Sequence, residues 1–366
     1  MISDLFDELS NIHTIDDMYH AFQDEEHCRY LMENLVWPTG RICPCCGFRR
    51  SIMICGRDMG KKRARPGLYQ CSNSSCRFQF TVTTHTPLHS TKLPLSLWLK
   101  GMWLILQSDK GISSVRLGEI LGISQQSAWR MGHAIRLLAA GAHMLDGTVE
   151  LDQFYLGGRQ RKPPDQPPSG RGRKGEPRTT KKPVTLLVQR SSSLEKGSLS
   201  GQVRAEVVDD LSIKSSELFL TDNLSQETNL MSDDWGAFKT VGNYCSSHET
   251  VNHSQKEYVR GTVHVNGAEG FNARVKQTVS GVFHHISPQH ANLYFHEMAF
   301  RWSQRTVEKT MFRKTKSGRQ TRRTLWTRIA PAMQIKNILK YAIGRQFRRT
   351  SKGSISIKSK IAVFGW

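Results

Sequence analysis

The sequence predicts a multidomain α+β protein, in which a helical, cysteine-rich front part precedes an α/β domain. The chain has 366 residues, which is enough for two or three domains. Most of its eight cysteines fall between positions 28 and 76, and this clustering marks a small separate module. From about residue 149, strand-like apolar runs alternate with helical segments, which is the pattern of an α/β sheet domain.

The charge of the chain points to a polyanionic partner. It has 52 Lys and Arg against 31 Asp and Glu, a formal net charge of +21 and a pI near 9.9. Nucleic acid is the leading candidate, because Lys and Arg release counterions from phosphates. A merely basic or ribosome-associated protein is the alternative. The start lacks the apolar region of a secretory signal, and no stretch approaches the ~18 apolar residues of a membrane helix. We therefore expect a cytoplasmic, nucleoid-associated protein without a membrane partner.

Five segments are expected along the chain. They are a helical segment (1–40), a cysteine-rich module (41–92), a helical DNA-binding region (93–145), an α/β domain (146–308) and a basic tail (309–366) that is partly helical. A loop rich in Pro, Gly, Lys and Arg, residues 159–183, separates the first two strands of the α/β domain and predicts a basic excursion. The tail is expected to contact phosphates, with a solvated helix as the alternative.

The cysteine-rich module predicts a zinc ribbon. Cys43-Pro-Cys-Cys-Gly47 fits the zinc-knuckle form C-P-x-C-G, and about 25 residues separate it from the second cysteine pair, which suits a β-ribbon. Four thiolates form the closed tetrahedral site of a structural Zn²⁺. The expected ligands are Cys43, Cys46, Cys71 and Cys76. Because four residues separate the second pair, Cys45, Cys55 and His85 stay open as substitutes.

The region 113–136 predicts a helix-turn-helix. Gly122 suits the tight turn between two helical stretches, and Ser124 fits the N-cap of the second helix. The exposed start of such a recognition helix reaches base edges and phosphates, and the residues expected there are Gln125, Gln126, Ser127 and Arg130. An ordinary helical hairpin has the same pattern, but the adjacent zinc ribbon and the basic charge favour DNA.

Asp152 is the first of three acidic residues that are candidates for catalysis. It lies within the alternating run 149–156, on the same face as Glu150 and Phe154. A carboxylate in the middle of a strand needs a partner or a metal, because burying it unpaired is costly.

Two more candidates lie further along the chain. Asp233 follows a short strand expected at 228–231, at the carboxyl end where α/β sites form. Glu269 lies near the start of an expected helix, three residues after Asn266, so that both side chains can face one site.

Carboxylates from two strands and a helix suit hard divalent cations such as Mg²⁺. Two such ions about 4 Å apart can promote phosphodiester chemistry. On the residues alone, Asp222 and Asp234 remain competitors for the second position.

Several motifs occur together in a fixed order. Three of them are Glu150-Leu-Asp-Gln-Phe-Tyr-Leu-Gly-Gly158, Ser232-Asp-Asp-Trp-Gly-Ala-Phe238 and His264-Val-Asn-Gly-Ala-Glu-Gly-Phe271; the others are residues 22–31, 37–47, 78–87 and 281–301. With these motifs, the chain from about residue 22 to 305 resembles the bacterial insertion-sequence transposases that have an N-terminal zinc ribbon and an RNase H-like catalytic core.

The resemblance implies which residues form the site. The family uses two aspartates with a helix-borne Asn and Glu, and these fall on Asp152, Asp233, Asn266 and Glu269. It favours Asp233 over Asp222, because the family's second aspartate precedes a polar-aromatic stretch such as 235–238. His253 and His264 match histidines near that site. The spacing of the second cysteine pair and the length of the 159–183 loop depart from the family's pattern.

The resemblance also implies an activity. An enzyme of this family binds the terminal inverted repeats of its element and performs strand cleavage and strand transfer with Mg²⁺ or Mn²⁺. Its expected partners are double-stranded DNA, as transposon ends and target, and further copies of itself in a homodimer or larger assembly. Two alternatives stay open. One is a transposase-derived DNA-binding regulator without catalytic activity, and the other is a nuclease or resolvase without strand transfer.

Overall fold

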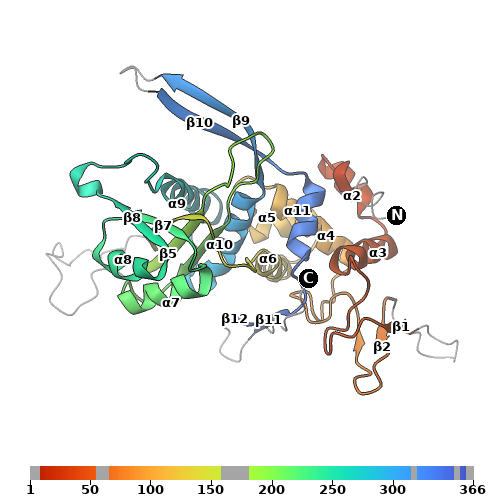
Figure 1. The fold of residues 1–366 in the computed structure, drawn as a ribbon. Helices are drawn as coiled ribbons and strands as arrows, with labels where there is room; N and C mark the ends of the chain where they lie inside the picture. Colours follow the sequence, from red (N-terminus) through yellow and green to blue (C-terminus); the bar gives the residue numbers. More distant parts are fainter. Residues whose placement is uncertain (1–8, 55–65, 158–180, 315–319, 350–354, 360–366) are drawn as a thin grey trace, which may run out of the picture. The chain divides into compact units, whose positions relative to one another are not determined.

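The computed structural model describes residues 9–54, 66–157, 181–314, 320–349 and 355–359 (Figure 1). The chain divides into two compact units: Met1–Ala140 with Ile329–Trp366, and Gly141–Arg328. The second unit is thus inserted within the sequence of the first. Cys55, and the predicted basic loop as far as residue 180, lie outside the described residues.

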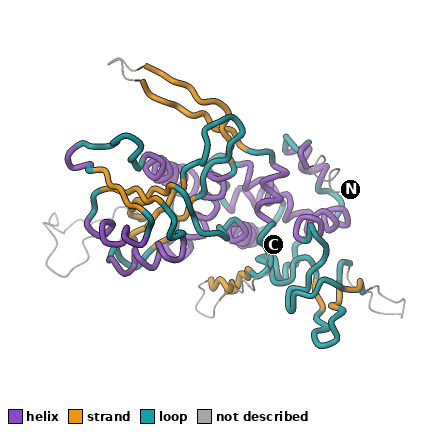
Figure 2. The backbone as a smooth tube through the Cα atoms, in the orientation of Figure 1, coloured by secondary structure: helices purple, strands orange, loops and turns teal. Residues whose placement is uncertain are grey.

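The first unit is mainly helical in the part that the structure describes (Figure 2). Its helices before the insertion are α2 (Ile15–Ala21), α3 (Glu25–Val36), α4 (Leu95–Gln107), α5 (Ser114–Leu121) and α6 (Gln125–Leu138). Thr14 and Asp17 form a capping box at α2, and Asp24 caps α3. Most residues of α4 are buried, including Trp98, Leu99 and Met102, so this helix is central to the core of the unit.

The cysteine-rich module is a small antiparallel sheet of β1 (Ser51–Met53), β2 (Tyr69–Cys71) and β3 (Gln79–Phe80). Tyr69 and Phe80 are fully buried and pack edge-on against Trp37. The Tyr69 hydroxyl donates to the carboxylate of Glu33 in α3. These contacts fix the ribbon to the helix that precedes it.

The segment after the insertion completes the first unit. Helix α11 (Pro331–Leu339) contacts α3 and α4, and strand β11 (Arg345–Arg349) pairs with β12 (Ile355–Ser359). The buried guanidinium of Arg345 donates to the carbonyls of Leu137 and Leu138 at the end of α6, at 3.3 and 3.0 Å. Arg345 thereby satisfies carbonyls that a helix end leaves without partners.

The second unit contains a five-stranded mixed sheet in the order β6-β5-β4-β7-β8. Its strands are β4 (Thr148–Leu156), β5 (Lys182–Gln189), β6 (Val203–Val207), β7 (Asn229–Asp233) and β8 (Ser247–Val251). β4, β5 and β6 form an antiparallel meander, while β7 and β8 run parallel to β4. This topology is RNase H-like and fits the fold class that the sequence predicted.

Helices cover both faces of the sheet, because successive side chains of a strand point to opposite faces and apolar side chains are buried on both. Val149 and Leu151 of β4 pack with α7 (Ile213–Asn223) and α8 (Gly236–Val241). Phe154 and Leu156 pack on the other face with α9 (Asn266–Thr278) and α10 (Pro288–Ser303). The short helices η1 (Gly242–Tyr244), η2 (His253–Gln255) and η3 (Val279–Phe283) complete the connections.

The stretch predicted to be one basic tail divides between the units. Its first part belongs to a long hairpin of β9 (Arg305–Lys314) and β10 (Gln320–Arg328) in the second unit (Figure 1), and its second part contains α11. The Thr, Val, Met, Phe and Trp content of residues 305–328 favours strands.

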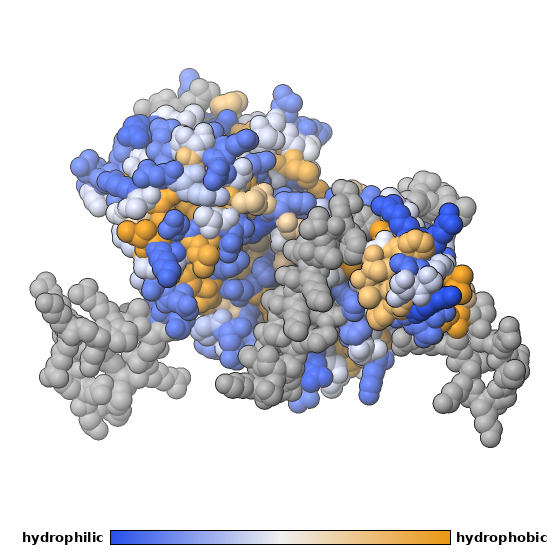
Figure 3. All heavy atoms as spheres, turned by 60° about the horizontal axis from the view of Figure 1, so that its bottom comes forward, coloured by the Kyte–Doolittle hydropathy of each residue, from blue (hydrophilic) through white to orange (hydrophobic). Residues whose placement is uncertain are grey.

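No helix in the described ranges is both long and apolar enough to cross a membrane. The face drawn in Figure 3 is mostly hydrophilic, with hydrophobic residues in smaller patches.

Candidate functional site

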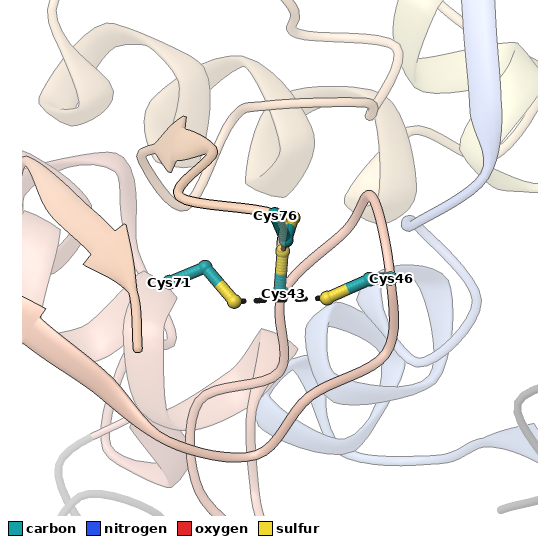
Figure 4. A group of neighbouring side chains, drawn as sticks. All are labelled: Cys43, Cys46, Cys71 and Cys76. Carbon is teal, nitrogen blue, oxygen red and sulfur yellow. Dashed lines mark hydrogen bonds between the residues drawn. The ribbon is translucent and has the colours of Figure 1, made fainter. Parts of the chain in front are cut away.

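The structure brings together the four cysteines predicted to bind zinc (Figure 4). The Sγ atoms of Cys43, Cys46, Cys71 and Cys76 all lie within 4.8 Å of one another. The Sγ–Sγ distances are 3.9 Å for Cys43–Cys76 and 3.6 Å for Cys46–Cys71. Tetrahedral thiolates with Zn–S bonds of ~2.3 Å lie about 3.8 Å apart. The donor set and its spacing therefore fit Zn²⁺.

The substitutes left open for this site are less well placed. Cys45 is exposed between Pro44 and Cys46 and is not part of the four-sulfur group. The ring of His85 bonds instead to the carbonyl of Pro44, through Nδ1 at 3.0 Å. The backbone turns at Gly47, whose φ is +76°, and its N–H donates to the carbonyl of Cys43. The knuckle thus closes as its glycine predicts.

Helices α5 and α6 are joined at the predicted turn. Gly122 has a left-handed backbone with φ +65°, and Ser124 caps α6 by accepting the N–H of Ser127. Gln125, Gln126 and Arg130 are exposed, whereas Ser127 is half-buried. The side-chain amide of Gln125 donates to Ser114 at 2.8 Å, which links the starts of the two helices.

Asp152 and Asp233 lie on neighbouring parallel strands, on the face covered by α9. Leu151 of β4 pairs with Ser232 of β7, and Asp152 and Asp233 are the residues that follow them. Asp152 is in the middle of β4, and Asp233 is the last residue of β7, so Asp233 lies within the strand that was expected to end before it. Both side chains are half-buried.

Burial and nearby charges shift the pKa values of the two aspartates. Burial raises the pKa of Asp152 to about 6, and the negative charges of Asp233 and Glu269 add to this rise. Burial also raises the pKa of Asp233, while the charge of His253 lowers the pKa of both aspartates. Asp233 Oδ1 is buried without a hydrogen-bond partner among the described residues. A buried oxygen of this kind suits a cation.

Glu269 and Asn266 lie in the first turn of α9, and both are exposed. The three acids form no closed cluster: of the described residues, only the four cysteines have all their ligand atoms within 4.8 Å. Like charges that share a site repel one another, so carboxylates without a cation between them are expected to stand apart. The oxygen donors and the orphaned oxygen of Asp233 fit Mg²⁺ or Mn²⁺.

The two competing aspartates lie elsewhere or have other partners. Asp222 is exposed on α7, and its charge adds to the effect of burial in raising the pKa of Glu206 on the edge strand β6. Asp234 bonds to Lys239 at 2.6 Å and to the amide of Asn252 at 3.0 Å. The geometry therefore favours Asp233 as the partner of Asp152.

A fully buried carboxylate that the sequence analysis did not single out lies beside these acids. Glu150 is 1% exposed and shares its face of β4 with Asp152. Its carboxylate is 2.6 Å from Arg190 Nε and 3.3 Å from His264 Nδ1, and it accepts the backbone N–H of Ala268 at 3.0 Å. Ala268 lies between Asn266 and Glu269, so Glu150 holds the turn of α9 that bears both.

The partners of Glu150 outweigh the cost of burying it. Burial alone would raise the pKa of Glu150. The hydrogen bonds from His264 and Arg190 act in the opposite direction, and the pKa of Glu150 lies below its ordinary value. Arg190 also donates to the carbonyls of Thr262 and His264. A carboxylate in the middle of a strand needs a partner, and this holds for Glu150 as it does for Asp152. This requirement is the signal in the sequence that could have found Glu150.

Comparison with known families agrees with this architecture. Residues 144–303 match the ISXO2-like transposase domain, and residues 23–79 match the transposase zinc-ribbon domain. Both matches are to domains of transposases. The chain combines the two domains of insertion-sequence transposases with an N-terminal zinc ribbon, as the resemblance implied.

Individual relatives are more distant. The chain is 26% identical over 270 residues to an uncharacterized protein in transposable element ISH50 of Halobacterium salinarum, a match over 71% of this chain and 85% of that protein. Among solved structures, the Mos1 strand transfer complex and a pre-cleavage Mos1 transpososome are each 12% identical. They cover 56% and 55% of this chain and 75% of each Mos1 chain, with TM-scores of 0.19 and 0.20.

Proposed function

We propose that this protein is a DNA transposase that binds the terminal inverted repeats of an insertion sequence and catalyses metal-dependent strand cleavage and strand transfer. The observation that supports the proposal is that Asp152 and Asp233 lie on the neighbouring parallel strands β4 and β7, on the sheet face covered by α9, whose first turn carries Glu269. The matching transposase domain covers all three residues.

Each residue of the proposed site has a distinct task. Asp152, Asp233 and Glu269 would hold Mg²⁺ or Mn²⁺, and Asn266 would orient a ligand or a phosphate. A bound divalent cation favours deprotonation of the attacking water or 3′-hydroxyl and neutralises charge on the leaving oxygen. Asp152 must itself lose its proton to be a ligand, and Glu150 keeps the first turn of α9 against the sheet.

The rest of the chain would supply DNA recognition. A structural Zn²⁺ on the four cysteines would stabilise the ribbon, and Gln125, Gln126, Ser127 and Arg130 would contact DNA from the start of α6. Cleaving and joining two ends requires that both be brought together, so the active form would be a homodimer or larger. It would act on chromosomal DNA in the cytoplasm.

The test is a cleavage assay on labelled duplexes that carry the repeats flanking the coding sequence. With Mg²⁺, the wild-type chain should nick the ends and produce joined products. Asp152→Asn, Asp233→Asn and Glu269→Gln should each lower cleavage by at least roughly 10³-fold, as the loss of one member of a catalytic unit does, while end binding is retained. Asp222→Asn is the matched control and should cleave normally.

The other outcomes identify the alternatives. End binding without metal-dependent cleavage would indicate a regulator derived from a transposase. Cut products without joined ones would indicate a nuclease or resolvase. Normal cleavage by Asp233→Asn with loss of cleavage by Asp222→Asn would assign the second acid to Asp222.

A further inference from the structure

The β9–β10 hairpin concentrates positive charge. Its two strands carry seven Lys and Arg, four in β9 and three in β10, against a single acid, Glu308. The whole chain has 52 basic against 31 acidic residues, so the hairpin is far more one-sided than the protein as a whole. A surface of one charge sign attracts a partner of the opposite sign.

The cations are exposed on both strands of the outer part of the hairpin. Lys309, Arg313 and Lys314 of β9 and Arg322 and Arg323 of β10 are all exposed. Strand pairing sets Lys309 and Arg323 on one face and Arg322 on the other, directly across from Phe312. The ring of Phe312 is 65% exposed, which is costly in water unless a partner covers it.

The inner part of the hairpin is fixed to the second unit, which is the catalytic unit of the proposed function. Arg305 and Val307 exchange backbone hydrogen bonds with Gly197, Ser198 and Ser200, at 2.8 to 2.9 Å. Further along β9, the hydroxyl of Thr310 donates to the carbonyl of Leu194 at 3.1 Å. From this base the strands extend away from the sheet (Figure 1). The cations are therefore held at a defined place on the catalytic unit.

Duplex DNA fits these features better than another protein does. The major groove is about 12 Å wide and admits a two-stranded β-ribbon, with a phosphate backbone on each side, and this hairpin carries cations on each of its strands. A second copy of the hairpin would bring like charges together. An isolated two-stranded hairpin is marginally stable in water, so a polyanion along its length would also stabilise it.

We propose that the β9–β10 hairpin is a DNA-binding arm of the catalytic unit, which contacts the phosphates of duplex DNA through Lys309, Arg322 and Arg323. The inference deepens the proposed function, on which it rests for DNA as the partner. The arm binds DNA independently of its base sequence, and it is separate from the residues at the start of α6.

The experiment measures the affinity of the full chain for a mixed-sequence duplex of roughly four helical turns, in Mg²⁺-free buffer, over a range of salt concentrations. The triple variant Lys309→Gln/Arg322→Gln/Arg323→Gln should bind about tenfold or more weakly at ~0.1 M salt, and its slope of log K against log salt should be smaller by about 2 to 3. The charge-conserving variant Lys309→Arg/Arg322→Lys/Arg323→Lys should stay close to the wild type. Lys214→Gln, which removes one exposed charge from α7, should change the slope by less than one.

Circular dichroism and zinc content that match the wild type will show that the triple variant is folded. A wild-type chain that does not bind the duplex overturns the proposed function. A wild-type chain that binds, with the neutralised variant equal to it in affinity and slope, overturns the arm alone. Sedimentation of the DNA-free proteins adds a third outcome. If neutralisation changes self-association and leaves DNA affinity unchanged, the hairpin is a protein interface and the inference is wrong.

Discussion

Asp152 illustrates at the scale of one residue how a carboxylate proposed to bind a metal costs stability. Its carboxyl group has an ordinary pKa of 3.8 in the unfolded chain and a pKa of about 6 in the folded one. Between these values the folded state binds more protons than the unfolded state, so the free energy of unfolding falls as pH rises. Its contribution is fully present below about pH 3.8 and is lost as pH passes through about 6. At neutral pH without metal, the ionised group destabilises the fold.

Asp152→Asn should therefore stabilise the metal-free protein at pH 7, because the amide carries no charge to desolvate or to repel Asp233 and Glu269. The gain should be on the order of 1–3 kcal/mol, seen as a rise of about 2–12 °C in the Tm of the second unit. Thermal unfolding in Mg²⁺-free buffer without chelator, which would strip zinc, is the measurement. The difference from wild type should shrink as pH falls towards 4.

Asp222→Asn serves as the control for that prediction. Asp222 is exposed on α7, which covers the sheet face opposite to α9, so its substitution should leave the Tm within about 1 °C of wild type. Equal stabilisation by both variants would show that the loss of any one negative charge, and not the repulsion among the three acids, is the cause.

At the scale of elements, the position of α9 depends on the buried ion pair beneath it. Glu150→Gln removes the charge that Arg190 and His264 face, and the loss should cost on the order of 3 kcal/mol. Because the single amide oxygen of Gln cannot accept from both Arg190 and Ala268, the first turn of α9 should shift and kcat for cleavage should also fall, by roughly 10- to 100-fold, at temperatures where the variant is folded. The stabilisation by Glu150 is present above its ordinary pKa of 4.5 and is lost as pH falls through the lower pKa of the folded state.

A matched control for this element is the buried pair Glu297–Arg301 on α10, with a 2.7 Å separation. Glu297→Gln should lower stability without lowering kcat in the folded protein. If both variants lose activity in proportion to stability, Glu150 has only a structural role.

The zinc ribbon gives a second prediction for an element. Cys46→Ser should abolish the bound zinc, expected at one ion per chain by mass spectrometry, and should unfold the ribbon. Cys45→Ser changes the neighbouring exposed cysteine and should keep the full zinc content. If Cys45→Ser lost its zinc and Cys46→Ser kept it, the zinc ligand would be Cys45 and not Cys46.

For the whole molecule, the proposed reaction predicts a change in assembly. Mixing the chain with end duplexes should give a complex that contains two ends and at least two chains, measured by light scattering or native mass spectrometry. Chains of Asp152→Asn should enter this complex, because the substitution spares binding. A stable, cleaving complex of one chain with one end would contradict the dimer.

The parts of the fold that local patterns could predict were those with strong periodicity. The alternating run expected at 149–156 matches β4, and the strand expected after the 159–183 loop is β5. Strand β8 was missed because its sequence, Ser-His-Glu-Thr-Val, is polar where it lies exposed at the sheet edge. The β9–β10 hairpin was missed because closely spaced Arg and Lys mask its alternation.

The site divides in the same way. Cysteine spacing indicated the four thiols whose Sγ atoms lie within 4.8 Å of one another in the structure. The partners of Glu150 could not be predicted locally, since Arg190 is 40 positions away along the chain and its pairing depends on the β4–β5 register. The assignment of roles to Asp152, Asp233, Glu269 and Asn266 stays a prediction.

The return of residues 329–366 to the first unit has a consequence for biosynthesis. The carbonyls that end α6 are satisfied by Arg345, which the ribosome adds only after the whole catalytic unit. The nascent chain therefore holds the complete five-stranded sheet before Arg345 can bond to the end of α6. A product that stops early through frameshifting or nonsense mutation would keep Asp152, Asp233 and Glu269 but lack Arg345. Translation thus sets the moment at which the first unit becomes complete.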